Sequence, residues 1–306
     1  MLADVRPPFL LLAALYVLVC FTWGTTWLGI KLAVDTVPPL TAAGLRFLIA
    51  FPPLLAYALL RGEPLRFPRG QGGYFAAMTG GYFFLPYFLI NFGGQYVSSG
   101  LAALLFSTMP VFVVIFSAFM LRERVHWSQL LGIGLGFYAL TMVVTGEGLA
   151  LAYGQKLGAL AILLAAVLHA ACYVAAKSHG AGVSPVTFNT LPAGIAGALL
   201  FAAGLAFERP DLADISATSL LALVYLGAVA SVGGFIAYFH LLKHLSPVTL
   251  SFVFLIFPVV SVALAHVVEG TRFSPDFPFF AGMLLAGFAL TMLAKLPSGW
   301  LRARDG

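Results

Sequence analysis

The sequence predicts an all-α integral membrane protein whose ten transmembrane helices form two inverted five-helix repeats. The first observation is composition, because the 306 residues are 61% hydrophobic and only 9% charged, against roughly 25% charged in soluble proteins. The second is that the apolar residues fall into ten runs separated by short polar turns. The third is a pattern shared by the two halves of the chain. So few charged residues cannot coat a soluble core, so the outer surface must face lipid.

Each of the ten runs approaches the length of about 20 residues that a helix needs to cross a bilayer. The first run is long and has no A-x-A cleavage site, so we expect a retained helix rather than a signal peptide. The loops are short and leave no room for a soluble domain, which places any function within the bilayer. The predicted spans are 9–32, 40–60, 73–93, 98–120, 128–145, 157–177, 185–206, 218–241, 247–268 and 277–295.

Lysine and arginine side chains indicate the orientation. Most of them fall in loops on the side that holds both termini, and the opposite side has only Lys31, Lys156, Arg209 and Arg272. By the positive-inside rule, both termini are expected in the cytoplasm. The net charge of +5 is spread over many short loops, so it is a sign of orientation and not of nucleic-acid binding.

A stretch near the end of each half is repeated. FSTMPVFVVIFSAFMLRERV at 106–125 is matched by FLIFPVVSVALAHVVEGTRF at 254–273, each with an internal proline and a closing glutamate. We divide the chain into repeats 1–146 and 147–306. Because five spans is an odd number, the second repeat enters the membrane upside-down. Inverted repeats are typical of secondary transporters, which hold substrate near the midplane, although some channels also carry them.

The first two spans of each half also align without gaps, and this indicates a central cavity. The first two matched positions are four residues apart, so in each half they share one helix face. We interpret these faces as matching cavity walls, and the alternative is an interfacial belt or a packed core. The aligned pairs are Trp23 with His169, Trp27 with Tyr173, Lys31 with Lys177 and Pro39 with Pro185.

These features together resemble the drug/metabolite transporter superfamily, in particular its EamA-type ten-helix exporters. The matching features are Trp23-Gly24 and Lys31 in the first span, Arg46 in the second, Pro110 with Glu123, Pro258 with Glu269, and glycine-rich fifth and tenth spans. Among such exporters the chain looks most like the YddG-type amino-acid exporters. The resemblance implies export of amino acids, aromatic ones among them, across the bacterial inner membrane. The second half has Pro192 opposite Arg46, so any role of that arginine is not duplicated.

Carboxylates are missing from the centres of the spans. All eleven aspartates and glutamates lie in loops, tails or span ends, whereas ion-coupled carriers and exporters of cationic drugs usually hold a carboxylate at depth. We therefore predict facilitated transport driven by the substrate. Protonation of His169, near the middle of the sixth span, is the alternative coupling mechanism. A core histidine with a hydrogen-bonded neighbour is the other interpretation.

Without a buried carboxylate, a substrate ammonium would have to meet carbonyls, hydroxyls or aromatic faces, the last contributing about 0.5–2 kcal/mol. In the third span Phe83, Tyr87 and Asn91 recur every four residues and form one stripe. Tyrosines and serines also commonly join transmembrane helices, which is the alternative for each candidate. The predicted substrate-binding residues are Trp23, Trp27, Tyr82, Phe83, Tyr87, Asn91, Ser107, His169, Tyr173, Tyr238 and Ser251.

Several further residues are expected to shape the helices. Pro110 and Pro258 each remove an intrahelical hydrogen bond, so we predict that they act as gating hinges, or otherwise only shape the packing. Arg46 would either bind a substrate carboxylate or anchor its helix, and we favour anchoring or inter-helix bonding. Glu123 and Glu269 are expected to lock helix ends to backbone or to arginine.

Glycines predict close packing of the fifth and tenth spans, within or between subunits. Gly132, Gly134, Gly136 and the pair Gly282 with Ala286 place small residues four apart. Because the duplication already supplies both halves, a monomer suffices, and a lipid-stabilised dimer is the alternative. The expected partners are a small-molecule substrate and membrane lipids.

An enzyme is the competing class of protein. The sequence has no nucleophile with a base, paired aspartates, HExxH or Gly-rich phosphate loop, so we expect neither catalysis nor a cofactor. The cysteines, Cys20 and Cys172, lie in apolar runs and indicate neither a disulfide nor a metal site. Nucleotide conjugates would need several deep cations, whereas only Arg46 is deep. Small neutral solutes fit best, with drugs and other metabolites as alternatives.

Overall fold

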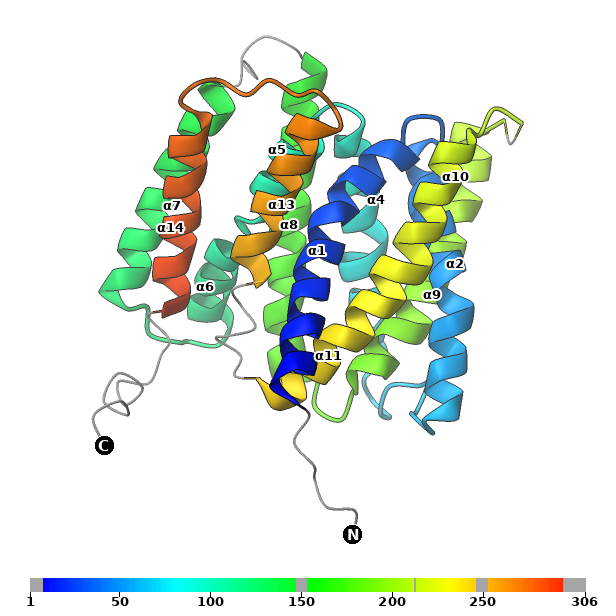
Figure 1. Cartoon of the computed structure of the whole chain (residues 1–306). Coiled ribbons are helices and arrows are strands. Elements are labelled where there is room, and N and C mark those ends of the chain that lie inside the picture. Colours follow the sequence, from blue (N-terminus) through cyan, green and yellow to red (C-terminus); the bar gives the residue numbers. More distant parts are fainter. Residues whose placement is uncertain (1–7, 147–152, 212, 246–252, 294–306) are drawn as a thin grey trace.

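The computed structural model describes residues 8–146, 153–211, 213–245 and 253–293, and helices linked by short turns make up this part of the chain (Figure 1). In chain order the helices are α1 (Phe9–Ala33), α2 (Pro39–Leu60), α3 (Gly72–Met78), η1 (Thr79–Phe84), α4 (Leu85–Gly94), α5 (Ser99–Phe106), α6 (Met109–Met120), α7 (Trp127–Gly146), α8 (Tyr153–His179), α9 (Pro185–Ala203), η2 (Gly204–Glu208), α10 (Ala217–Val224), η3 (Tyr225–Gly233), α11 (Gly234–His244), α13 (Val253–Val267) and α14 (Phe277–Leu293).

Among the described residues, seven helical segments are long and apolar enough to cross a membrane, and three shorter apolar helices accompany them. Each predicted span overlaps one of these segments, which confirms an all-helical membrane architecture. Residues 247–252 of the ninth predicted span and 294–295 of the tenth lie outside the described part of the chain. Ten crossings in two inverted halves stay a prediction.

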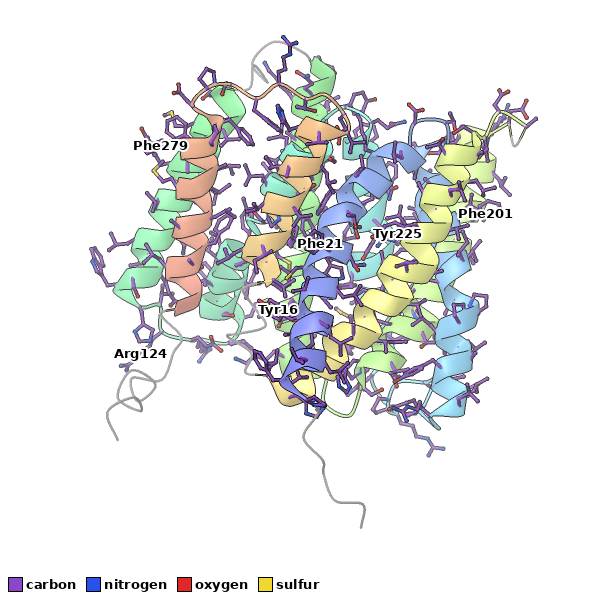
Figure 2. All side chains as sticks on the ribbon, in the orientation of Figure 1. Tyr16, Phe21, Arg124, Phe201, Tyr225 and Phe279 are labelled. Carbon is purple, nitrogen blue, oxygen red and sulfur yellow. The ribbon has the colours of Figure 1, made fainter. Side chains whose placement is uncertain are left out.

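Large apolar side chains cover much of the described surface. Phe279 on α14 is 68% exposed and lies on the outer side of the bundle (Figure 2), and Trp127 on α7 is 73% exposed. The helices are apolar nearly all round, which suits contact with lipid on one face and with other helices on the opposite face.

Polar side chains begin several of the helices. The hydroxyls of Ser98, Ser184 and Ser216 accept hydrogen bonds from backbone N–H groups in the first turns of α5, α9 and α10. Two carboxylates from the second half cap helices of the first half. Glu208 accepts from the N–H groups of Leu40 and Thr41 at 2.7 and 2.9 Å, at the start of α2.

Glu269 accepts from the Ser99 N–H at 3.2 Å, at the start of α5. A carboxylate at a helix N-terminus satisfies an unpaired N–H and opposes the positive end of the helix dipole. The prediction that Glu269 locks a helix end to backbone is therefore confirmed.

Two π-helical segments interrupt the α-helices. The η1 segment comes just before Pro86, whose missing N–H the wider turns accommodate. The η3 segment lies in the middle of the eighth predicted span, and in it the Ser231 hydroxyl donates to the Leu226 carbonyl at 2.8 Å. Such π-bulges are frequent at functional sites, and Ser231 contributes to the site described below.

Helix pairing follows a symmetric plan. In Figure 1, α7 lies beside α14, and contacts join α2 to α9 and α5 to α13. The pair α4 with α8 has its counterpart in α11 with α1, and the pair α6 with α8 has its counterpart in α13 with α1. Exchanging the two halves of the chain thus maps the first three of these contacts onto themselves and interchanges the members of the last two sets.

The pairing of α7 with α14 depends on glycines. A Cβ added at Gly132 would lie 2.5 Å from the Gly287 carbonyl, and one at Gly287 would lie 2.7 Å from the Gly132 carbonyl. The close packing predicted for the fifth and tenth spans therefore occurs within the chain. It uses Gly132, Gly136 and Gly287, whereas a Cβ at Gly134 or Gly282 meets open space.

Candidate functional site

A cavity of about 350 Å³ lies in the bundle between helices of both halves. Its size falls at the lower end of the range for small-molecule sites, roughly 300–1,000 Å³. Most of its lining is aromatic or aliphatic, with a few polar groups among the rings. Seven of the eleven predicted substrate-binding residues line it: Trp23, Trp27, Tyr82, Tyr87, His169, Tyr173 and Tyr238.

One helix face of α1 supplies the first wall. The Trp23 ring stacks on Tyr238 with centroids 5.0 Å apart, and the Trp27 ring tilts against Phe106 at 5.2 Å. Trp27 is only 7% exposed, so Phe106 and the surrounding buried side chains restrict the orientation of its ring. These contacts tie α1 to α11 and α5 around the cavity.

The matching face of α8 supplies the opposite wall. His169 is 4% exposed, and its ring meets the edges of Tyr82 and Phe106 at 4.6 and 5.3 Å between centroids. Its Nδ1 lies 3.0 Å from the Ala165 carbonyl. The positions aligned from the sequence, Trp23 with His169 and Trp27 with Tyr173, thus line the same cavity from two halves.

Three of the predicted residues lie outside the cavity lining. Phe83 is fully buried and packs edge-on against Phe47 at 5.6 Å. The Asn91 side-chain amide donates to the Tyr87 carbonyl at 2.8 Å, and the Ser107 hydroxyl donates to the Leu104 carbonyl at 2.7 Å. Ser251 lies outside the described residues. Their roles in binding stay predictions.

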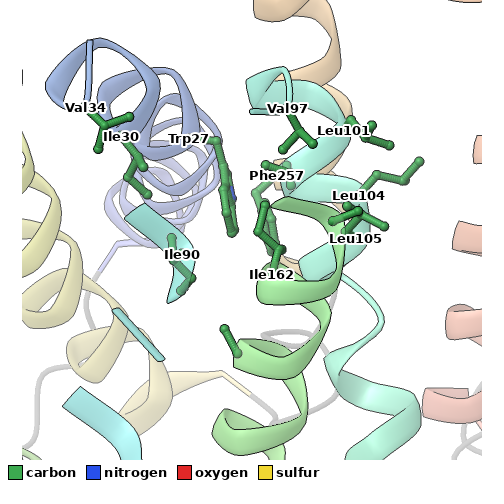
Figure 3. Packing of buried hydrophobic residues seen from close by; sticks show 14 of the residues in the cluster. Trp27, Ile30, Val34, Ile90, Val97, Leu101, Leu104, Leu105, Ile162 and Phe257 are labelled. Carbon is green, nitrogen blue, oxygen red and sulfur yellow. The ribbon is translucent and has the colours of Figure 1, made fainter. Parts of the chain in front are cut away.

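The cavity extends toward one end of the bundle. Its lining reaches Tyr74 at the start of the third span, Ala176 near the end of α8, and Gly180 and Val183 in the following turn. At the other end, Ile30, Val34, Val97 and Leu101 belong to a buried apolar cluster (Figure 3). Tight apolar packing between α1, α4 and α5 therefore separates the cavity from the end where α1 finishes.

The predicted hinge prolines lie at different kinds of position. The fourth span is interrupted between α5 and α6, and Pro110 stands in the first turn of α6. Pro258 lies inside α13 and is buried. Their gating role stays a prediction.

Arg46 was not among the predicted cavity residues, because anchoring or inter-helix bonding was favoured for it over binding of a substrate carboxylate. The guanidinium lines the cavity, is 5% exposed, and donates from Nε to the Ser231 hydroxyl at 3.1 Å. Arg46 therefore forms an inter-helix hydrogen bond, which was one of the expected roles, and does not snorkel outward. Phenylalanines were also missed, because a helix that is apolar all round does not reveal which face points inward. They are Phe106, Phe188, Phe235, Phe254 and Phe257.

Two histidines four residues apart, His240 and His244, stand in α11 with ring centroids 4.8 Å apart. Their spacing suits two ligands of one metal, but a site needs further ligands. Within the described residues, no group of three or more histidines, cysteines or carboxylates could hold a metal ion.

Comparison with known proteins identifies the family of the chain. It matches the EamA-like transporter family twice, over residues 10–145 and 156–293. It is 38% identical to Protein PagO of Salmonella typhimurium (strain LT2), over 96% of this chain and 97% of that protein. It is 30% identical to the "Uncharacterized inner membrane transporter YedA" of Escherichia coli (strain K12), over 94% of this chain and 92% of the relative.

Two further similarities bear on function and fold. A "Probable amino-acid metabolite efflux pump" of Escherichia coli (strain K12) is 28% identical, over 84% of this chain and 87% of that protein. A crystal structure of 22% identity covers 92% of this chain and 98% of its own with a TM-score of 0.67, which supports the fold. The resemblance to EamA-type proteins is thus confirmed, and this multi-pass membrane protein belongs to the EamA-like transporter family.

Proposed function

We propose that the protein is an inner-membrane secondary transporter that exports amino acids, aromatic and other neutral ones, by facilitated alternating access. The observation that carries this proposal is the central cavity, whose aromatic walls come from both halves of the chain. Aromatic faces suit both an apolar side chain and an ammonium group. The relative named as an amino-acid metabolite efflux pump supports the same substrate class.

Alternating access would follow from two inverted repeats, 1–146 and 147–306. The symmetric helix pairing supports this arrangement, since related contacts in the two halves can exchange roles as the bundle rocks. The apolar cluster around Trp27 and Val97 then acts as the closed gate. The cavity reaches the opposite end, which the distribution of positive charge assigns to the cytoplasm. A relative named as an inner membrane transporter fits this location.

Counterflow tests the proposal directly. Purified protein is reconstituted into liposomes loaded with unlabelled phenylalanine, tryptophan, threonine or methionine, and uptake of the labelled solute is followed without an ion gradient. We expect robust counterflow for the aromatic pair. Trp27→Ala should reduce it, because the ring forms part of the cavity wall, whereas Trp127→Ala on the exposed face of α7 should not. Absence of counterflow for all four would overturn the substrate class and favour drugs or other metabolites.

Proton coupling through His169 is the alternative mechanism that the same assay separates. His169 lines the cavity, so a proton could reach its ring from the open end. We expect His169→Gln to keep counterflow and to respond to an imposed proton gradient as the wild type does. Transport that appears only with a proton gradient, and disappears in this variant, would replace facilitated transport with proton-coupled transport.

A further inference from the structure

Arg46 is a buried cation that the protein itself leaves incompletely satisfied. A guanidinium carries five N–H donors. Nε donates to Ser231, and the guanidinium carbon lies 5.0 Å above the centroid of the Tyr87 ring. Its two Nη atoms make no hydrogen bond to any residue that the structure describes. Because the side chain is 5% exposed and lines the cavity, the opening available to these donors is the cavity itself.

No carboxylate in the described chain compensates this charge. The ion pair found among the described residues joins Lys177 to Glu123, and Arg46 is the only lining residue with a permanent charge there. A buried cation without an anion is costly in a membrane protein, and such residues mark substrate pathways. A single hydroxyl and a tyrosine face offset part of that cost. An anionic ligand would offset the remainder.

The position of Ser231 keeps the guanidinium oriented. Its hydroxyl hydrogen is given to the Leu226 carbonyl, so the oxygen is free to accept from Nε. This contact occupies the Nε–H, so the pair Nη1 and Nη2 remains at the end of the guanidinium, and the Tyr87 ring covers one face. A planar fork held in this way is suited to bind a carboxylate through two parallel hydrogen bonds.

We infer that Arg46 binds the carboxylate of the transported solute, and that the cavity takes a monocarboxylate with an apolar or aromatic body. The single positive charge of Arg46 matches a ligand with one negative charge, so phosphates are disfavoured. The same charge repels cationic amphipathic drugs. The rings of Trp23, Tyr82 and Phe106 suit the apolar body. This inference rests on the proposed function and narrows it, because the carboxylate, not the ammonium, becomes the obligatory group.

Three ligands with one phenyl ring separate these requirements in binding to the purified full-length protein, measured by calorimetry. Phenylalanine carries both charges, 3-phenylpropionate only the carboxylate, and 2-phenylethylamine only the ammonium. We expect the two carboxylates to bind and the amine to bind at least about 10-fold more weakly, since hydrogen bonds to charged groups are worth about 10-fold or more in affinity. Equal affinity of the amine and of 3-phenylpropionate would overturn the inference.

Arg46→Gln is the decisive variant. It should weaken both carboxylates by at least about 10-fold and leave the amine unchanged. Arg61→Gln, at the exposed end of the same helix, should bind all three ligands as the wild type does. If Arg46 were only structural, Arg46→Gln would weaken all three alike, and that result would overturn the inference.

A second variant and a second assay cover the case in which Arg46→Gln does not fold and separate the two proposals. If Arg46→Gln does not fold, as judged by elution and melting temperature, Arg46→Lys keeps the charge without the fork and should still lose affinity for the carboxylates alone. Amino-acid counterflow on the same preparation separates the two proposals. Counterflow with no dependence of binding on the carboxylate overturns the role of Arg46 only. Failure of both binding and counterflow overturns the proposed function as well.

Discussion

Lys177 forms an ion pair with Glu123 at the end of the bundle toward which the cavity extends. The aligned lysine of the first half, Lys31, instead donates to the Gln95 carbonyl at 3.1 Å, and Glu269, the closing glutamate of the second copy, caps α5. Matched residues thus have different partners at the two ends of the molecule, as the cavity itself is open toward one end. Glu123 had been expected to bond backbone or arginine, and the ion pair that the structure gives it is with a lysine.

The carboxylates differ in what they contribute to stability. The Lys177 and Glu123 side chains are 64% and 32% exposed, and such surface pairs contribute about 0–1 kcal/mol. Glu208 accepts two backbone N–H groups and the Thr41 hydroxyl, so Glu208→Gln should lower the free energy of unfolding by about 1–3 kcal/mol. Denaturant unfolding in detergent should therefore rank Glu208→Gln well below Glu123→Gln. Equal losses in the two variants would contradict this account of capping.

Gly287 and Gly282 lie on one helix and offer a matched pair of substitutions. A Cβ at Gly287 would meet the backbone of Gly132 and Gly136 within 2.8 Å, so Gly287→Ala must push α7 and α14 apart. We expect a loss of about 1–3 kcal/mol in the free energy of unfolding. Gly282→Ala meets open space and should be neutral, or stabilising by up to about 1 kcal/mol through helix propensity. Similar melting temperatures for both variants would show that the glycine contact does not hold this pair.

Tyr225 joins the eighth predicted span to α1, and Figure 2 shows it between the two helices. Its hydroxyl bonds to the Thr25 hydroxyl and also donates to the Thr22 carbonyl at 3.3 Å. Tyr225→Phe should cost about 0.6–1.7 kcal/mol, the range for hydrogen bonds between transmembrane helices. Tyr138→Phe, at an exposed position on α7, is the control and should leave the unfolding transition in place.

More of the fold than of the candidate site could be predicted from the sequence. Span positions follow from hydrophobicity alone, and the alignment of Trp23 with His169 placed two cavity residues because related faces of a duplicated chain meet in the middle. The stripe in the third span was less informative. Tyr87 lines the cavity, whereas Phe83 lies within η1 and is buried in a cluster that also includes Tyr87. A period of four assumes a regular α-helix, and η1 departs from it before Tyr87.

The orientation of the Arg46 side chain could not be predicted from the sequence. An arginine six residues inside a span can reach the membrane surface or turn inward, and hydropathy is the same for both. What decides is the hydroxyl of Ser231, which comes from a segment far along the chain and is reached only after folding. The polar residues Thr26 and Asn189 were missed for the same reason, since each needs a tertiary neighbour to define which way it faces.

The break between α5 and α6 is where we expect gating to be most sensitive. Ser107 and Thr108 donate to the Leu104 and Leu105 carbonyls at 2.7 Å, so their hydroxyls occupy acceptors that a continuous helix would use. Pro110 has no N–H to give and suits the first turn of α6. The two hydroxyls and the proline therefore each favour the break between α5 and α6. Pro110→Ala alone restores one backbone hydrogen bond, so it should slow counterflow only about 2–5-fold.

The triple variant Ser107→Ala, Thr108→Ala, Pro110→Ala removes the two hydroxyls and the proline together. It should favour a continuous helix through 98–120 and slow counterflow by at least about 10-fold, because bending at this point is then costly. Binding of phenylalanine, measured by calorimetry, should change less than the rate, since neither proline nor hydroxyl is part of the cavity lining. Counterflow at the wild-type rate in the triple variant would show that the break shapes packing only. Equal losses in rate and in affinity would assign it to the binding site instead of the gate.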